Sequence, residues 1–173
     1  MMRTLRKIIS IFQSPEIFAR KQGVTVGNGC SIMTKNFGSE PYLINIGDNV
    51  QVTKGVSFFT HGGAWLLRME NPNFDFFGKI VIKNNVYIGN NTLLMPGITI
   101  EDNVIVGAGS VVTKSVPTGK IVAGNPAKII GEYSDYKSRM DKYNLNTKIM
   151  NFDEKKKFLL SLDESNFISK KFM

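Results

Sequence analysis

The sequence is poor in the residues from which metal centres and disulfide frameworks are built. Its 173 residues include one cysteine, Cys30, and one histidine, His61. A single cysteine excludes an intramolecular disulfide and any zinc module made of several cysteines. A single histidine excludes sites that need two or three imidazoles, so we expect no metal cofactor.

Long apolar runs are also missing. The longest nearly apolar run near the start covers residues 8–12, far fewer than the roughly 20 residues that cross a bilayer. No small-residue cleavage site follows it. The sequence therefore predicts neither a signal peptide nor a membrane anchor, and a cytoplasmic location.

The net charge of +8 is spread unevenly. Basic residues exceed acidic ones by four in 1–22, by one in 23–133 and by three in 134–173. These basic flanks predict solvated helix faces with a weak attraction to a membrane surface or another polyanion. Because no nucleic-acid-binding motif accompanies them, we expect no nucleic-acid partner.

A six-residue repeat occupies the middle of the chain. Triplets rich in turn-forming residues, such as Lys-Asn-Asn at 83–85 and Gly-Ala-Gly at 107–109, separate its members. Neither a helix nor a plain antiparallel strand repeats every six residues, whereas a solenoid with three short strands per 18-residue coil does. The pattern predicts an all-β solenoid of parallel strands. Its inner column is expected to contain Ile82, Ile88, Leu94, Ile100, Val106 and Val112.

The repeat defines the expected domain organisation. It is weaker upstream and breaks between Phe58 and Ile82, so we expect 59–77 to project as a loop from one corner of the solenoid. The solenoid domain should cover 23–131. Residues 1–22 and 132–173 are expected to form helical additions that cover its open ends or make trimer contacts.

The run from Gly78 to Gly131 resembles the hexapeptide-repeat acyltransferases of left-handed β-helix fold. The strongest part is GAGSVVTKSVPTGKIVAGNPAKII at 107–130, and the resemblance extends over about 24–131. Relatives include galactoside, maltose, serine and xenobiotic acetyltransferases, and sugar O-acetyltransferases of bacterial surface-polysaccharide pathways.

The resemblance implies a homotrimer that moves an acetyl group from acetyl-CoA to a sugar or lipid-linked saccharide hydroxyl, with active sites between adjacent chains. An antibiotic O-acetyltransferase is the main alternative. A nucleotide-sugar N-acetyltransferase and a noncatalytic scaffold are two further alternatives.

His61 matches the family's catalytic position, directly after a repeat strand. An imidazole there can take the proton from an attacking hydroxyl, because it titrates near neutral pH. Glu70, Asp75 or a carbonyl group is expected to orient the ring. Cys30 is a competing nucleophile by residue type, but its place in the repeat predicts burial as a small apolar residue.

The resemblance also implies a donor groove. The backbone amide of Asn90 is expected to face the thioester oxygen. Tyr87 stands where many relatives have tryptophan and should form an aromatic wall, while Ala108 lets the pantetheine approach.

The phosphates of the donor have their own expected contacts. Thr113 and Lys114 match the family pair near the adenosine phosphates, and Lys128 matches the basic residue that meets the 3′-phosphate region.

For the acceptor, two interpretations of the loop stay open. Trp65, Arg68 and Phe74 either form a sugar platform or pack the loop onto its own solenoid.

Overall fold

The structure, a computed structural model, describes residues 13–170 and 172. The chain divides into two compact units, Met1–Tyr133 and Ser134–Met173. We call them the β-helix unit and the tail unit. Within the described residues, no helix is both long and apolar enough to cross a membrane.

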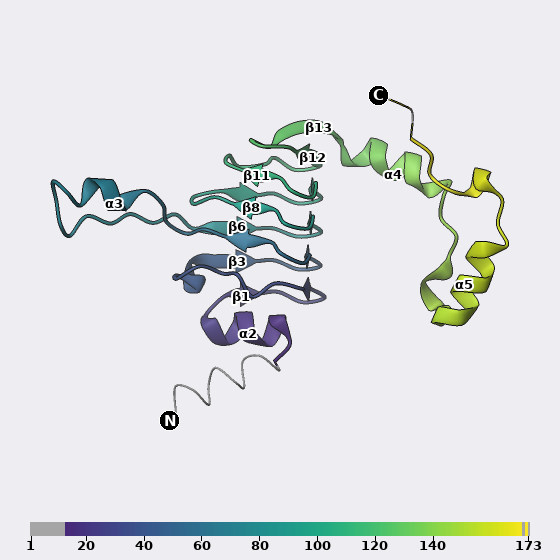
Figure 1. Cartoon of the computed structure of the whole chain (residues 1–173), viewed down its shortest axis with the longest axis horizontal. Helices are drawn as coiled ribbons and strands as arrows, with labels where there is room; N and C mark the ends of the chain where they lie inside the picture. The colour runs from purple at the N-terminus through teal and green to yellow at the C-terminus, as the bar shows by residue number, and fades with distance from the viewer. Residues whose placement is uncertain (1–12, 171, 173) are drawn as a thin grey trace. The chain divides into compact units, whose positions relative to one another are not determined.

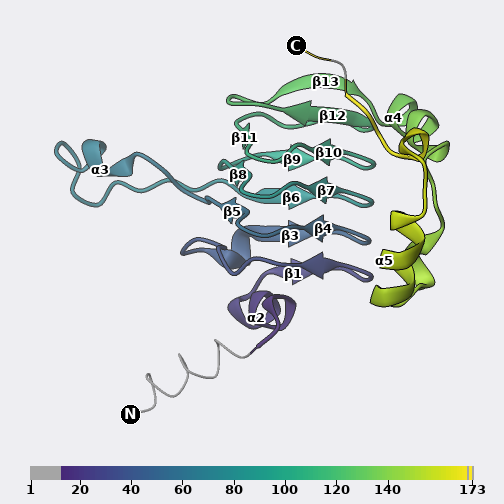
Figure 2. The same cartoon turned by 45° about the vertical axis from the view of Figure 1, so that its right-hand side comes forward.

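The β-helix unit is a stack of coils made from three sheets (Figures 1 and 2). Sheet A contains β1 (Thr25–Val26), β3 (Ile44–Ile46), β6 (Ile80–Ile82) and β9 (Thr99–Ile100). Sheet B contains β2 (Ser31–Ile32), β4 (Gln51–Val52), β7 (Tyr87–Ile88), β10 (Ile105–Val106), β12 (Lys120–Ala123) and β13 (Lys128–Glu132). Sheet C contains β5 (Ser57–Phe58), β8 (Leu93–Leu94) and β11 (Val111–Val112).

All pairings between named strands are parallel except that of β12 with β13. From β3 to β11, successive strands enter sheets A, B and C in turn. Three strands therefore make one coil of a parallel β-helix.

The register confirms the predicted inner column. Partners on neighbouring coils are Ile82 and Ile100, Ile88 and Val106, and Leu94 and Val112. None of these six side chains is more than 1% exposed. Truncating such a residue to alanine typically lowers the free energy of unfolding by about 2–5 kcal/mol, because the neighbouring coils hold their positions and a cavity remains. The repeat thus encodes a continuous core.

The corner between sheets A and B is held by side-chain oxygens that accept backbone N–H groups from the adjacent coil. Asp102 Oδ1 accepts from Asn84 N at 2.7 Å, Asn84 Oδ1 accepts from Asp48 N at 2.8 Å, and Asp48 Oδ1 accepts from Asn28 N at 2.7 Å. The next residue at this corner, Asn85, has φ 56°, a conformation that asparagine tolerates. The turn triplets therefore link the coils as well as bend the chain.

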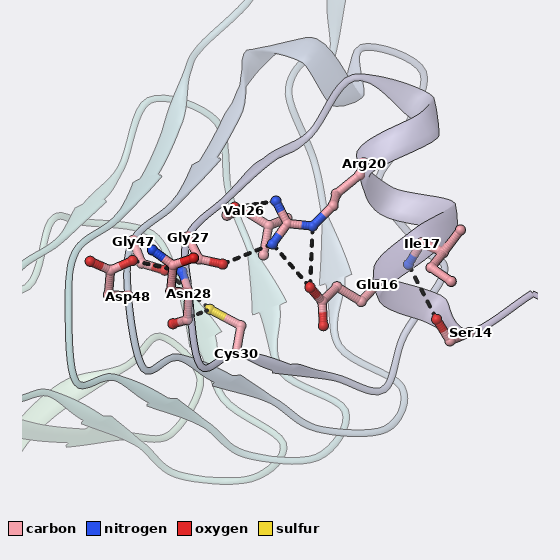
Figure 3. A network of polar contacts seen from close by, with 10 residues as sticks. All are labelled: Ser14, Glu16, Ile17, Arg20, Val26, Gly27, Asn28, Cys30, Gly47 and Asp48. Carbon is pink, nitrogen blue, oxygen red and sulfur yellow. Dashed lines mark hydrogen bonds and ion pairs between the residues drawn. The ribbon is translucent and has the colours of Figure 1, made fainter.

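Helix α2 (Pro15–Gln22) covers the first coil and ends at Gly23, whose φ is 99°. Ala19 faces the coil with no exposed surface. Arg20 reaches from the helix to the carbonyl oxygens of Val26 and Gly27 (Figure 3). It also pairs with Glu16 at 3.0 Å. The helix expected within 1–22 is thus present from Pro15, and residues 1–12 lie outside the described part.

Cys30 departs from its expected burial. Its side chain is half-buried, and its Sγ lies 3.1 Å from the carbonyl oxygen of Gly47, to which it donates (Figure 3). The first coil lies at the end of the stack, where fewer neighbours cover a side chain.

The other end of the stack closes differently. Val116 adds a bridge to Ile100 in sheet A. The chain then forms β12 and turns back through β13, which pairs with it antiparallel. Ile129 and Ile130 on β13 are 54% and 65% exposed.

The tail unit is helical. Helix α4 (Tyr133–Asp141) begins at the boundary between the units, and α5 (Phe152–Leu160) follows the short 3-10 helix η2 (Thr147–Ile149). A capping box between Asn151 and Glu154 fixes the start of α5. A last 3-10 turn, η3, covers Glu164–Asn166.

Candidate active site

The predicted loop leaves the β-helix after β5 and returns at β6. Its base is closed by a hydrogen bond from Gly78 N to the carbonyl oxygen of Thr60, 2.7 Å long. A Cβ on Gly78 would lie 2.3 Å from Gly97 N, so only glycine fits there. Beyond this base the loop extends away from the stack and carries the short helix α3 (Ala64–Leu67) (Figure 1). The coil thus fixes residues 60 and 61 while the rest of the loop reaches outward.

His61 is held by a glutamate that sequence reasoning missed. Its Nδ1 lies 2.8 Å from Glu40 Oε2. The hydroxyl of Thr60 donates to the same oxygen at 2.5 Å. The ring of Phe77 meets the imidazole edge to face, with centroids 6.0 Å apart. Glu40 and Phe77 therefore position the imidazole directly, and Thr60 does so through Glu40.

The expectation that Glu70 or Asp75 orients His61 is wrong. Asp75 instead pairs with Arg68 inside the loop, at 3.3 Å, and Glu70 is exposed. Glu40 precedes His61 by 21 residues and lies in the connection between β2 and the 3-10 helix η1 (Pro41–Leu43). That connection does not follow the six-residue repeat, so the repeat could not predict where Glu40 lies relative to His61.

Glu40 is also kept in place by its own neighbours. Gly38 has φ 67°, and a Cβ there would lie 3.0 Å from the carbonyl oxygen of Phe58. The connection therefore lies directly against β5. Asn36 forms a bridge with Ser57 on the same strand. Glu40 reaches His61 because its segment lies beside β5 in the incomplete first coil.

The electrostatics of the pair suit a general base. The hydrogen bond from Thr60, followed by the contacts with His61, holds the pKa of Glu40 below its ordinary value of 4.5. An ionised carboxylate only accepts hydrogen bonds, so it favours the tautomer in which Nδ1 carries the proton. Nε2 then keeps its lone pair. The His61 side chain is 42% exposed and Glu40 14%, so the imidazole is open to a substrate while its partner is sheltered.

Three of the expected donor residues lie near one another. Asn90 and Ala108 occupy the same corner on successive coils, where Gly109 N donates to Asn90 O at 2.8 Å. Gly89 packs so closely against the next coil that a Cβ would lie 2.5 Å from Ala108 N. Tyr87 lies on β7 just before this corner and is 40% exposed. These residues form a continuous strip where sheet B leads into sheet C.

The phosphate-contact candidates are distributed differently. Thr113 and Lys114 follow β11, so they lie beyond the opposite end of the sheet C strands, and both are exposed. Lys128 is exposed at the start of β13. His61 follows β5 and therefore shares the corner of Thr113 and Lys114. Within one chain, the width of sheet C separates this corner from Asn90.

The acceptor candidates are exposed on the loop. Trp65 is 79% exposed on α3, and it lines a small cavity of about 250 Å³ with Arg68 and Met69. Arg68 is held by the carbonyl oxygen of Phe74, to which its Nε donates at 2.9 Å, and by Asp75. In this chain Trp65 does not pack the loop onto its own β-helix. Among residues 13–170 and 172, no three His, Cys, Asp or Glu side chains gather as metal ligands.

Comparison with known proteins agrees with the fold and the repeat. The family described as "Bacterial transferase hexapeptide (six repeats)" matches residues 79–114. The chain is 50% identical to Protein CapG of Staphylococcus aureus over 151 residues, covering 85% of this chain and 88% of CapG. It is 39% identical to the galactoside O-acetyltransferase of Escherichia coli K12 over 98 residues, covering 56% of this chain but only 47% of that enzyme.

Solved structures of acetyltransferases also resemble this chain. A hexapeptide-repeat acetyltransferase of Vibrio cholerae complexed with acetyl-CoA superposes with a TM-score of 0.55 at 28% identity, covering 64% of this chain and 61% of that one. A maltose O-acetyltransferase of Clostridium difficile superposes with a TM-score of 0.53 at 26% identity, covering 68% and 73%. The stacked coils and the family match over residues 79–114 define a hexapeptide-repeat protein. The chain belongs to the hexapeptide-repeat acyltransferase family, as its sequence predicted.

Proposed function

We propose that the protein transfers the acetyl group of acetyl-CoA to a hydroxyl of a sugar, in surface-polysaccharide biosynthesis. It does so on a left-handed β-helix assembled as a homotrimer. The observation that carries the proposal is the His61–Glu40 pair, whose Nδ1 to Oε2 distance is 2.8 Å. The relatives support a sugar acceptor, since the galactoside and maltose O-acetyltransferases act on sugars by name.

His61 acts as the general base in this reaction. Nε2 takes the acceptor's hydroxyl proton while the hydroxyl oxygen bonds to the acetyl carbon and the bond from carbon to sulfur breaks. The imidazolium formed is stabilised by the ionised Glu40 and returns the proton to the departing thiolate. Acetyl-CoA supplies the activated acyl group. The products are the sugar ester and free CoA.

Other residues bind the donor and the acceptor. The backbone amide of Asn90 stabilises the negative charge that develops on the thioester oxygen. The strip of Tyr87 and Ala108 suits an extended pantetheine chain because Ala108 is small and exposed. Lys114 and Lys128 supply positive charge for the phosphates, with Thr113 as a hydroxyl donor.

The alternatives differ in what they require. A noncatalytic scaffold needs no partly buried carboxylate beside an imidazole, so the Glu40–His61 pair argues against it. An antibiotic O-acetyltransferase would use the same base and donor groove. It differs only in the acceptor, for which Trp65 and Arg68 on the exposed loop are the candidates.

Acceptor assays with the purified chain test the proposal. Acetyl transfer would be measured with glycosides, lipid-linked sugars and hydroxylated antibiotics. We expect His61→Ala to reduce transfer roughly 10²–10⁴-fold while CoA binding and the circular dichroism spectrum are unchanged, because His61 lies outside the core. Full activity of this variant would refute the mechanism, and turnover with antibiotics alone would favour the alternative.

A further inference from the structure

One face of α5 combines exposed apolar side chains with lysines. Phe152, Lys155, Lys156, Leu159 and Leu160 line a groove of about 450 Å³. Phe152 and Leu160 are 79% and 78% exposed. Positions i, i+3, i+4, i+7 and i+8 lie on one side of a helix, so these residues form a single face. We call it the α5 face.

The acidic residues of α5 lie off this face. Asp153 and Glu154 do not line the groove, and Glu154 is engaged in the capping box with Asn151. Just before the helix, Ile149 is 95% exposed and follows Lys148. The helix start is therefore fixed, and the apolar and basic groups are presented to solvent together.

A cavity in the tail unit is also rich in basic residues. This cavity of about 350 Å³ is lined by three basic residues, Arg139, Lys142 and Lys170, and by Tyr136, Met140, Tyr143, Ile168 and Ser169. No acidic residue lines it. Guanidinium and ammonium groups without a neighbouring carboxylate suit a phosphate group.

We propose that the tail unit binds the surface of an anionic phospholipid membrane. Phe152 and Leu160 enter the boundary between headgroups and acyl chains, and the lysines of the α5 face meet the lipid phosphates. The cation-lined cavity accepts a headgroup phosphate. This inference does not depend on the proposed function.

Charge distinguishes this occupant from a second copy of the chain. Residues 134–173 carry a surplus of three positive charges, so two α5 faces would bring like charges together. An anionic surface satisfies the lysines and the apolar groups at once. The consequence would be to hold the enzyme where lipid-anchored saccharides are concentrated.

Vesicle flotation of the full chain tests the proposal. Vesicles of phosphatidylcholine alone are compared with vesicles that also contain phosphatidylglycerol. We expect binding only to the latter, weakening as salt is raised. Phe152→Ser with Leu160→Ser should lower the partition coefficient by at least about tenfold, since both side chains that would enter the membrane are lost.

A matched pair of lysines tests the face itself. Lys156→Gln should weaken binding by about fivefold. Lys157→Gln removes the same charge from a residue that does not line the groove, and should cause a clearly smaller loss. Transfer to a soluble glycoside should be unchanged in all these variants, which separates this test from that of the acetyltransferase activity.

Four results would overturn the proposal. The first is no binding to anionic vesicles at low salt. The second is equal vesicle binding by the Phe152→Ser, Leu160→Ser variant. The third is dissociation of an oligomer by that variant in sedimentation, which would identify a second copy as the occupant. The fourth is saturable binding of soluble glycerol phosphate without vesicle binding, which would identify a free phosphate ligand.

Discussion

At the scale of single residues, the sequence pointed to His61 as the candidate base but not to Glu40 as its partner. The histidine follows a repeat strand closely, so its place in the repeat could be recognised. Its partner is distant in sequence and is brought close only by the path of the incomplete first coil. Such a contact depends on how an irregular segment packs, which no periodicity encodes. Glu70 and Asp75 were chosen by proximity in sequence, and Asp75 turned out to pair with Arg68.

The role of Glu40 can be tested with an isosteric change. We expect Glu40→Gln to lower kcat/KM roughly 10- to 1,000-fold, because a neutral amide stabilises the imidazolium less and no longer selects one tautomer. The KM for acetyl-CoA should be unchanged. Glu70→Gln is the matched control, since Glu70 is an exposed carboxylate in the 59–77 loop, which carries His61. Steady-state kinetics check both variants, and equal activity of the two would refute the pairing.

The lowered pKa of Glu40 also predicts how stability depends on pH. Because its folded-state pKa lies below 4.5, the folded state favours the ionised form, and this contribution is fully present above 4.5. It is lost as pH falls through the folded-state pKa. In urea denaturation, the free energy of unfolding of the wild type should exceed that of Glu40→Gln at pH 7. The difference should shrink steadily below pH 4.5, and a difference that grows on acidification would contradict this prediction.

At the scale of elements, the strands were predictable and the connections were not. The strands follow from the six-residue period, because each inner residue is fixed by partners one coil away. From Asn84 to Asp102 the offset is 18 residues, as predicted, but from Asp48 to Asn84 it is 36. The additional 18 residues reflect the insertion of the 59–77 loop between β5 and β6. Its short helix α3 and its exposed tip do not follow the repeat, so the repeat could not predict their conformation.

The helix that covers the first coil gives a prediction at this scale. Arg20 donates to two backbone carbonyl oxygens of the coil, those of Val26 and Gly27. Arg20→Met keeps the length of the side chain but removes these bonds, so we expect a loss of about 1–2 kcal/mol in the free energy of unfolding. Lys21→Met removes the same charge from an exposed neighbour and should change it by less than about 0.5 kcal/mol. Urea denaturation measures the change in the free energy of unfolding for each variant. Equal changes would mean that the lost charge, not the two hydrogen bonds, causes the effect of Arg20→Met.

At the scale of the whole molecule, the placement of the site residues points beyond one chain. His61 follows a sheet C strand, whereas Asn90 precedes one, so sheet C lies between them. Trp65 is 79% exposed on a loop that extends away from its own stack. If neighbouring chains pack side by side, the His61 corner of one can face the Asn90 corner of the next. His61 and Asn90 lie on opposite sides of sheet C in one chain, and a site shared between two chains would bring them together.

Mixing two inactive variants tests this arrangement. His61→Ala removes the base. Ala108→Trp places a bulky ring on an exposed position of the donor strip and should block the pantetheine path without disturbing the core. If each site takes its base from one chain and its donor strip from the next, co-expression should restore about a quarter of the wild-type activity, since random assembly leaves that fraction of interfaces with both parts intact. Each variant alone should stay inactive, and both should sediment as trimers. A mixture no more active than its components would mean that one chain holds the whole site.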